Sequence, residues 1–120
     1  MKLIPLKKIN KIKVTKSCTA YEYPNGDKDI WGAVIKINGR YPNRGRTVNL
    51  KCKELVYFLR GKGKLVVERK SVSVQKGDQV VIEKGERFYW QGKLTMFMPC
   101  SPAWYPEQHK EGRWGHLKQN

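Results

Sequence analysis

The sequence predicts an all-β fold, and three features lead to that prediction. Short segments with alternating apolar and polar residues follow one another along most of the chain. Glycine, proline and asparagine residues that favour turns separate these segments, and no segment has the clear period of an amphipathic helix. A chain of 120 residues suffices for one core and is too short for two, so a single domain over residues 1–120 is expected.

The first third of the chain provides the first strands. Its opening segment alternates leucine and isoleucine with lysine, and its period is ambiguous. Pro24, Asn25 and Gly26 form a strong turn signal between two segments of strand character. The expected elements, in order, are an N-terminal arm or edge strand at 1–16, strands at 17–23 and 30–38, and a loop at 39–46.

The rest of the chain continues with hairpins. Gly61, Lys62 and Gly63 are expected to form a short glycine hairpin between strands at 54–60 and 64–70. The segment 71–90 is divided by a turn at 76–78, and residues 93–100 give the last clear strand. Residues 101–120, rich in proline and aromatic residues, are expected to form a C-terminal tail.

The spacing of residues between 47 and 61 resembles the first motif of the cupin superfamily. In that motif, two histidines separated by one residue precede a glutamate by three or four positions, and a glycine follows the glutamate after six residues. Glu54 and Gly61 keep the second half of the motif. The histidine positions are occupied by Val48 and Leu50 or, with the other permitted gap, by Thr47 and Asn49.

The second cupin motif is kept in its spacing as well. Gly77, Asp78 and Gly85 match it, whereas Glu83 stands in the proline position and Phe88 in the histidine position. The resemblance implies a cupin-type double-stranded β-helix, a jelly-roll barrel, and a tail that packs across the barrel or exchanges with a partner subunit. Since only the glutamate of the usual ligand set remains, we expect no metal and no cofactor.

Strand alternation predicts which side chains face the inside of such a barrel. If Glu54 points inward, Val56 and Phe58 do so as well, whereas Tyr57 lies on the opposite face. One interpretation is a barrel filled by its own side chains. The other is a pocket in which aromatic rings stack on a ligand and a few polar groups bind it. The candidate ligand-binding residues are Glu54, Asn49, Phe88, Trp90, Trp31, Tyr57 and His109.

The sequence leaves three classes of function open, and two of them follow from this interior. The first is metal-independent binding of a small molecule, either carbohydrate-like or an anionic metabolite, by a protein that forms homodimers. The second is a metal-free isomerase or epimerase that uses Glu54 with His109 or Tyr57, because one histidine of near-neutral pKa suffices for proton transfer. A histidine on the surface is the other interpretation of His109.

The third class rests on charge. The formal net charge is +15, from 25 Lys and Arg against 10 Asp and Glu. A basic polyanion-binding, nucleic-acid-binding or structural protein would use this surface. The cations are spread along the whole chain, so the sequence predicts only nonspecific nucleic-acid binding at low salt.

The cysteines and the hydropathy of the chain indicate the cellular compartment to expect. Cys18, Cys52 and Cys100 are widely spaced and odd in number, which is typical of free thiols in a reducing compartment. Cys52 is either a buried small residue or a reactive thiol activated by its lysine neighbours. The chain lacks an apolar run of about eighteen residues, so we expect neither a membrane span nor a signal peptide and a cytoplasmic protein.

Overall fold

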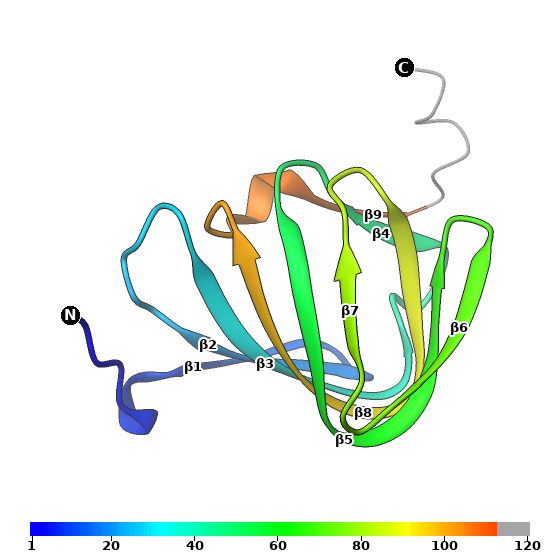
Figure 1. Ribbon diagram of the computed structural model, residues 1–120, viewed down its shortest axis with the longest axis horizontal. Coiled ribbons are helices and arrows are strands. Elements are labelled where there is room, and N and C mark those ends of the chain that lie inside the picture. Colours follow the sequence, from blue (N-terminus) through cyan, green and yellow to red (C-terminus); the bar gives the residue numbers. More distant parts are fainter. Residues whose placement is uncertain (113–120) are drawn as a thin grey trace.

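The computed structural model describes residues 1–112, so the last part of the tail expected at 101–120 lies outside the described residues. Strands make up most of the described chain, and the helical elements are two short 3-10 turns (Figure 1). No helix in this part of the chain is long and apolar enough to cross a membrane. The elements, in order, are η1 (Leu6–Lys8), β1 (Asn10–Thr15), β2 (Cys18–Tyr23), β3 (Trp31–Tyr41), β4 (Arg46–Asn49), β5 (Lys53–Val67), β6 (Lys70–Gln75), β7 (Gln79–Ile82), β8 (Arg87–Ser101), η2 (Pro106–Gln108) and β9 (His109–Gly112).

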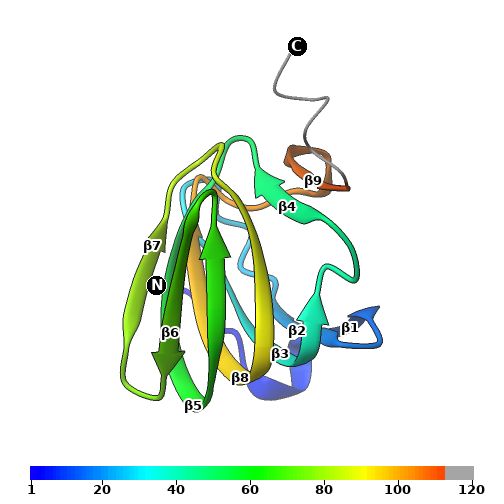
Figure 2. The ribbon, with the colours of Figure 1, turned by 90° about the vertical axis from the view of Figure 1, so that its right-hand side faces the viewer.

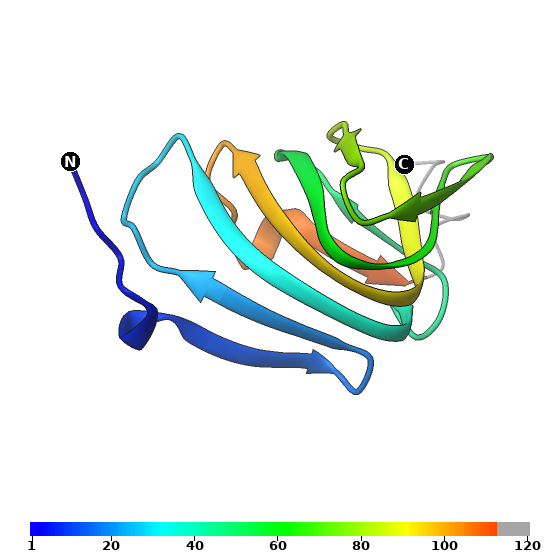
Figure 3. The same ribbon diagram turned by 60° about the horizontal axis from the view of Figure 1, so that its bottom comes forward.

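The strands form one curled antiparallel sheet, which confirms the all-β jelly-roll prediction. Neighbouring strands follow the order β1-β2-β3-β8-β4-β9, and β5 pairs with β6, β7 and β8. The curl brings β4 and β9 across from β2 and β3, so that the sheet encloses an interior (Figures 2 and 3). Strand β8 is central, because it pairs with β3 and β5 along most of its length and with β4 at its start.

Strands β5 and β8 are long and strongly bent, and the bend corrects one prediction from the sequence. Gly61, Lys62 and Gly63 do not form a hairpin; they lie inside β5, opposite β8. A Cβ atom at Gly61 would lie 2.0 Å from the Lys93 carbonyl oxygen, and one at Gly92 would lie 2.7 Å from the Gly63 Cα. Glycine is therefore required here because two bent strands approach closely.

The two ends of the described chain lie beside the interior. Strand β1 lies within the segment expected as an arm or edge strand at 1–16. Among the described strands it pairs with β2 alone, at the edge of the sheet. Strand β9 brings the first part of the tail back to β4, with Asn49 opposite His109 and Thr47 opposite Glu111. The tail thus packs across the barrel in the described residues.

Side chains alternate along β5 as predicted. Val56 and Phe58 are fully buried, whereas Leu55 and Tyr57 are 37% and 43% exposed on the outer face. The buried residues build one apolar cluster that includes Phe58, Leu65, Val74, Leu94 and Met96. Glu54, on the same inner face as Val56, is 6% exposed and lies near the start of the strand.

Candidate functional site

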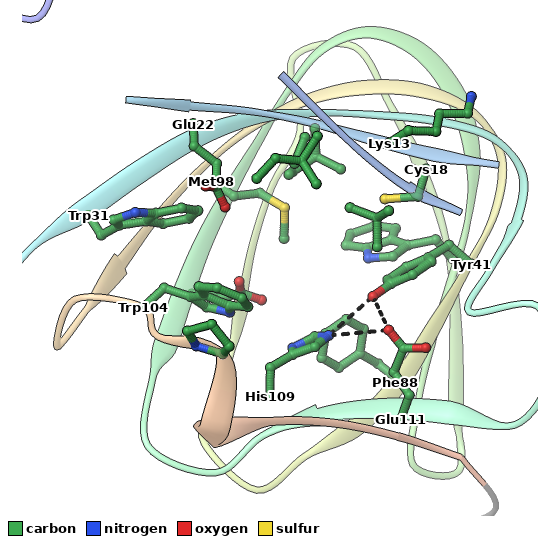
Figure 4. Close-up of a pocket in the computed structure, with 17 residues that line it drawn as sticks. Lys13, Cys18, Glu22, Trp31, Tyr41, Phe88, Met98, Trp104, His109 and Glu111 are labelled. Atoms are coloured by element: carbon green, nitrogen blue, oxygen red, sulfur yellow. Dashed lines mark hydrogen bonds and ion pairs between the residues drawn. The ribbon is translucent and has the colours of Figure 1, made fainter. Parts of the chain in front are cut away.

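A cavity of about 450 Å³ opens between the first strands and the C-terminal segment. Strands β1, β2 and β3 supply one wall, β5 and β8 supply the floor, and residues 104–111 close the remaining side. Figure 4 shows the lining side chains converging on this space from all of these elements. The cavity therefore depends on segments from the whole length of the described chain.

Aromatic rings form much of the cavity wall. Trp31 and Trp104 are stacked, with ring centroids 5.6 Å apart and an interplanar angle of 28°. Both are only partly buried, and both line the cavity. Phe88 and Trp90 also line it, but each is 2% exposed and belongs to the apolar cluster. The accessible ring surface is thus supplied mainly by the two stacked tryptophans.

Glu54 contributes a buried carboxyl group to this cavity. Its Oε1 atom has no hydrogen-bond partner among the described residues, and the same holds for Nδ2 of Asn49. Burial raises the pKa of Glu54 to about 7, and the neighbouring Asn49 side chain opposes this shift. A carboxyl group of this kind exists in both protonation states near neutral pH.

His109 is held in one tautomer by its neighbours. The backbone N–H groups of Lys51 and Cys52 donate to Gln108 Oε1, at 3.1 and 3.2 Å. The amide nitrogen of Gln108 therefore points at Asn49 Oδ1, 2.9 Å away, and this oxygen must accept. His109 Nδ1 lies 2.8 Å from the same oxygen and donates to it. In the neutral ring, Nε2 is thus the basic nitrogen.

The basic nitrogen of His109 faces a hydrogen-bonded group of polar side chains. Nε2 lies 3.1 Å from the Tyr41 hydroxyl, which donates to Glu111 Oε2 over 2.7 Å (Figure 4). Nε2 also lies 2.8 Å from Thr47 Oγ1, whose hydroxyl donates to the Lys110 carbonyl oxygen. Tyr41 can therefore give its proton to either His109 or Glu111, which is the arrangement of a short proton relay.

The protonation states suit such a relay. Burial lowers the pKa of His109 below its ordinary value, although the Glu111 carboxylate opposes the shift. Burial and the hydrogen bond to Glu111 raise the pKa of Tyr41 far above its ordinary value, so its hydroxyl stays protonated. At neutral pH, His109 is therefore a neutral base beside a protonated phenol.

The residues at the usual cupin metal position do not fit a metal ion. Thr47 and Asn49 are buried there, and their oxygens are engaged with His109, Gln108 and Lys110. Phe88, at the remaining histidine position, offers no donor atom. Residues 1–112 contain no group of three or more His, Cys, Asp or Glu side chains that could hold a metal ion.

The structure brings together most of the residues singled out in the sequence. Glu54, Phe88, Trp90, Trp31 and His109 line the cavity. Asn49 lies behind the cavity wall and acts through its hydrogen bond to His109. Tyr57 does not belong to the site, because strand alternation turns it to the outer face, where it is 43% exposed.

The cysteines are free and buried, as expected. The alternative of a reactive Cys52 is wrong. Its side chain is fully buried, and burial raises the pKa of its thiol despite the neighbouring lysines in the sequence.

Several site residues were not found from the sequence: Tyr41, Glu111, Gln108, Thr47 and Trp104. Tyr41 falls at the edge of a segment expected to be a loop, so no alternation rule applied to it. His109 and Glu111 are two residues apart in a short extended segment, and this spacing predicts a shared face. The spacing was the one signal in the sequence that could have added Glu111.

Comparison of structures defines the fold first. A Streptomyces PAC13 variant with uridine matches with a TM-score of 0.84 at 12% identity, over 94% of this chain and 91% of that chain. PAC13 is a nucleoside dehydratase. Ectoine synthase from P. lautus matches with a TM-score of 0.69 at 16% identity, over 87% of this chain and 80% of that chain. The polyketide cyclase RemF from Streptomyces resistomycificus matches with a TM-score of 0.66 at 19% identity, over 85% of this chain and 79% of that chain. Identities this low establish a shared fold alone.

Comparison of sequences then gives a match over part of the chain. A family model of the EutQ-like cupin domain matches residues 42–97, the part of the chain that holds both motif-like segments. A search of curated proteins finds no significant match. Residues 42–97 thus resemble a cupin domain in sequence, and the described fold is that of a cupin, as the motif spacing indicated. Other residues occupy the positions of the usual metal-binding histidines. A small-molecule-binding cupin agrees with these comparisons.

Three further expectations stay predictions: the homodimer, the cytoplasmic location and nonspecific nucleic-acid binding at low salt. Light scattering coupled to size-exclusion chromatography measures the first. Binding to random duplexes at increasing salt concentrations measures the third, and the affinity should fall steeply as salt is added.

Proposed function

We propose that the protein binds a small ring-containing organic molecule in the cavity, without a metal ion. The observation that carries this proposal is a cavity of about 450 Å³ that combines accessible tryptophan rings with a buried Glu54 oxygen, which has no hydrogen-bond partner within residues 1–112. Apolar walls with a few polar groups at fixed positions are the usual composition of a small-molecule site. A filled core has no reason to keep a carboxyl oxygen that lacks a hydrogen-bond partner among the described residues.

Between the two ligand classes that the sequence left open, the cavity favours a carbohydrate-like ring over an anionic metabolite. Glu22, Glu54 and Glu111 line the cavity, and Lys13 is the one lysine or arginine among the lining residues. An anion would enter a region of negative charge. Uridine is a suitable first probe, because the structurally similar PAC13 has been seen with it.

The test of binding uses a thermal-shift screen of nucleosides, sugars and small ring compounds, followed by titration monitored by tryptophan fluorescence. Trp104→Ala should abolish binding while the fold survives, because the ring is only partly buried. Tyr57→Ala is the matched control, since it removes an aromatic side chain from the outer face. Equal loss of binding in both variants would contradict the assignment of the site.

A second candidate function is a metal-free isomerase or lyase that works by proton transfer. The observation in its favour is that Glu54 and the Tyr41–His109–Glu111 group line the same cavity. One group would remove a proton from the carbon next to a carbonyl, and the other would deliver a proton to the substrate. Tyr41 takes the place in this scheme that the sequence gave to Tyr57 as the alternative to His109.

Exchange of hydrogen for deuterium separates catalysis from binding alone. Each compound that stabilises the protein is incubated with it in D2O, and the loss of C–H signals is followed by NMR. His109→Gln should slow the exchange by about 10²–10⁴-fold with little change in affinity. A lack of exchange with every bound compound would leave a binding protein and remove the enzymatic candidate.

A further inference from the structure

The charge of the cavity is opposite to that of the whole protein. The chain carries 25 Lys and Arg against 10 Asp and Glu. The cavity, in contrast, is lined by three glutamates and one lysine. Figure 4 shows the Lys13 side chain directed away from the space that the other labelled residues surround. A protein with such an excess of cations has thus collected carboxyl groups in this aromatic cavity.

The three carboxyl groups reach the cavity from different elements. Glu22 lies on β2, Glu54 on β5 and Glu111 on β9. Burial raises the pKa of Glu22 as well as that of Glu54, so both lose solvation in their present positions. The fold, and not their proximity in the sequence, brings these carboxyl groups to one cavity. A positively charged ligand would offset the cost of burying them.

Glu54 supplies the second, independent observation. Its side chain is 6% exposed, it lines the cavity, and its Oε1 has no hydrogen-bond partner among the described residues. An orphan acceptor at this depth is costly unless a donor arrives with the ligand. Three titratable groups interact electrostatically with the Glu54 carboxyl group: the Tyr41 hydroxyl and the thiols of Cys52 and Cys100. The remaining charged or titratable residues that line the cavity are Lys13, Cys18, Glu22, His109 and Glu111.

The aromatic wall lies at a fixed position relative to this acceptor. Trp31 is opposite Cys100 on β8, and Cys100 is opposite Glu54 on β5, so the three form one row across the sheet. Two strand spacings of about 4.8 Å separate the ends of this row. Trp104 stacks on Trp31 at the far end. Ring faces attract cations, and an ammonium group can donate to a carboxylate while its apolar body contacts the rings.

We propose that the ligand of this cavity carries a protonated amine, whose N–H groups bind the Glu54 carboxylate while its ring or chain packs against Trp31 and Trp104. This inference rests on the proposed binding function and names the chemical class of the ligand. It applies to a primary or secondary amine attached to an apolar or ring-containing body.

Binding of a cation to Glu54 requires the ionised carboxylate. Because the pKa of the empty site is about 7, amine binding below that pH releases a proton. The affinity should therefore rise by up to about tenfold per pH unit below pH 7 and become constant above it, until the amine itself loses its proton. Protonation of His109 at acid pH adds repulsion in the same direction.

The experiment compares three probes of similar size: 2-phenylethylamine, 2-phenylethanol and phenylacetate. Isothermal titration at pH 8 should show the amine binding at least about tenfold more tightly than the alcohol, with phenylacetate weakest. Glu54→Gln should remove this preference. Glu83→Gln is the matched control, because it removes an exposed carboxylate that does not line the cavity.

Proton release provides a measurement that does not depend on a variant. Titrations in two buffers of different ionisation enthalpy should give about one proton released per amine bound at pH 6 and almost none at pH 8.5. If Glu54→Gln fails to fold, this result decides the question on the unmodified protein.

The outcomes for the two proposals are distinguishable. Uridine or the alcohol binding as tightly as the amine, with Trp104→Ala abolishing both, would overturn the amine inference and keep the binding function. No amine binding at millimolar concentration would also overturn the inference. Failure of every ring compound to bind would remove both proposals.

Discussion

The two halves of the barrel interior differ in how they are filled. In the half around Phe58, Leu65 and Met96, apolar side chains pack against one another and are almost completely buried. In the half around Glu54 and His109, the wall carries partly exposed rings, a relay of polar groups and a cavity. The same sheet thus provides a packed core and a candidate site side by side.

This difference bears on the two interpretations of the interior that the sequence left open. Packed side chains fill one part of the interior and the cavity occupies the other, with the boundary at Phe88 and Trp90. Ligand binding in the cavity stays a prediction. Trp90 contacts Phe58 edge-to-face, with centroids 5.8 Å apart, and also lines the cavity. Substitutions on either side of this boundary should therefore affect different properties.

The largest effect is expected for Trp90→Ala. Removal of a fully packed ring should lower the free energy of unfolding by about 3–5 kcal/mol, because the surrounding cluster cannot close the space. Chemical denaturation measures this loss. A loss below about 1 kcal/mol would place Trp90 in the site instead of the core and would move the boundary.

Glu54→Gln should change the free energy of unfolding in the opposite direction. The folded-state pKa is raised from 4.5 to about 7, so the folded protein binds a proton more tightly than the unfolded chain does. The stabilising contribution of the protonated carboxyl group is therefore present below pH 4.5 and is lost as the pH rises to about 7. Above that pH, the amide variant should be more stable than the unmodified protein by up to about 3 kcal/mol.

Urea denaturation at pH 4.5 and pH 8 measures this difference, with Glu83→Gln as the control that should show no such pH dependence. A Glu54→Gln variant that is less stable at both pH values would indicate a paired carboxylate, as in a buried ion pair. That result would transfer Glu54 from the site to the structural framework.

A smaller effect is expected for Tyr41→Phe. The variant removes one buried hydroxyl and its hydrogen bonds to Glu111 and His109, which should cost about 1 kcal/mol of stability. Thermal denaturation measures the change, and exchange activity should fall more than stability does. Unchanged exchange, measured on a substrate that the unmodified protein exchanges, would exclude the hydroxyl from proton transfer.

The smallest effect is expected on the outer face. Tyr57→Phe should change the free energy of unfolding by less than about 0.5 kcal/mol and leave ligand binding unchanged, because the hydroxyl-bearing ring is exposed there. Denaturation and fluorescence titration together check both statements. A change in affinity would mean that the outer face takes part in binding.

The sequence predicted the fold class and the inward face of β5, since alternation and motif spacing are local properties of the chain. It could not predict the bend of β5, because Gly61 and Gly63 are read as a turn unless the approach of Gly92 on a distant strand is known. It also missed the Tyr41–Glu111 contact, which joins residues 70 positions apart. Hydrogen-bond networks of this kind depend on tertiary pairing, and one sequence carries little information about it.

Strand β9 supplies His109 and Glu111 next to β4, which holds Thr47 and Asn49 at the histidine positions of the cupin motif. β1, the first strand, lines the same cavity. A bound molecule would therefore join the first and last strands of the described chain, and both should become more protected from hydrogen exchange and proteolysis when the cavity is filled. The terminal strands, usually the first to fray, would then report occupancy of the site.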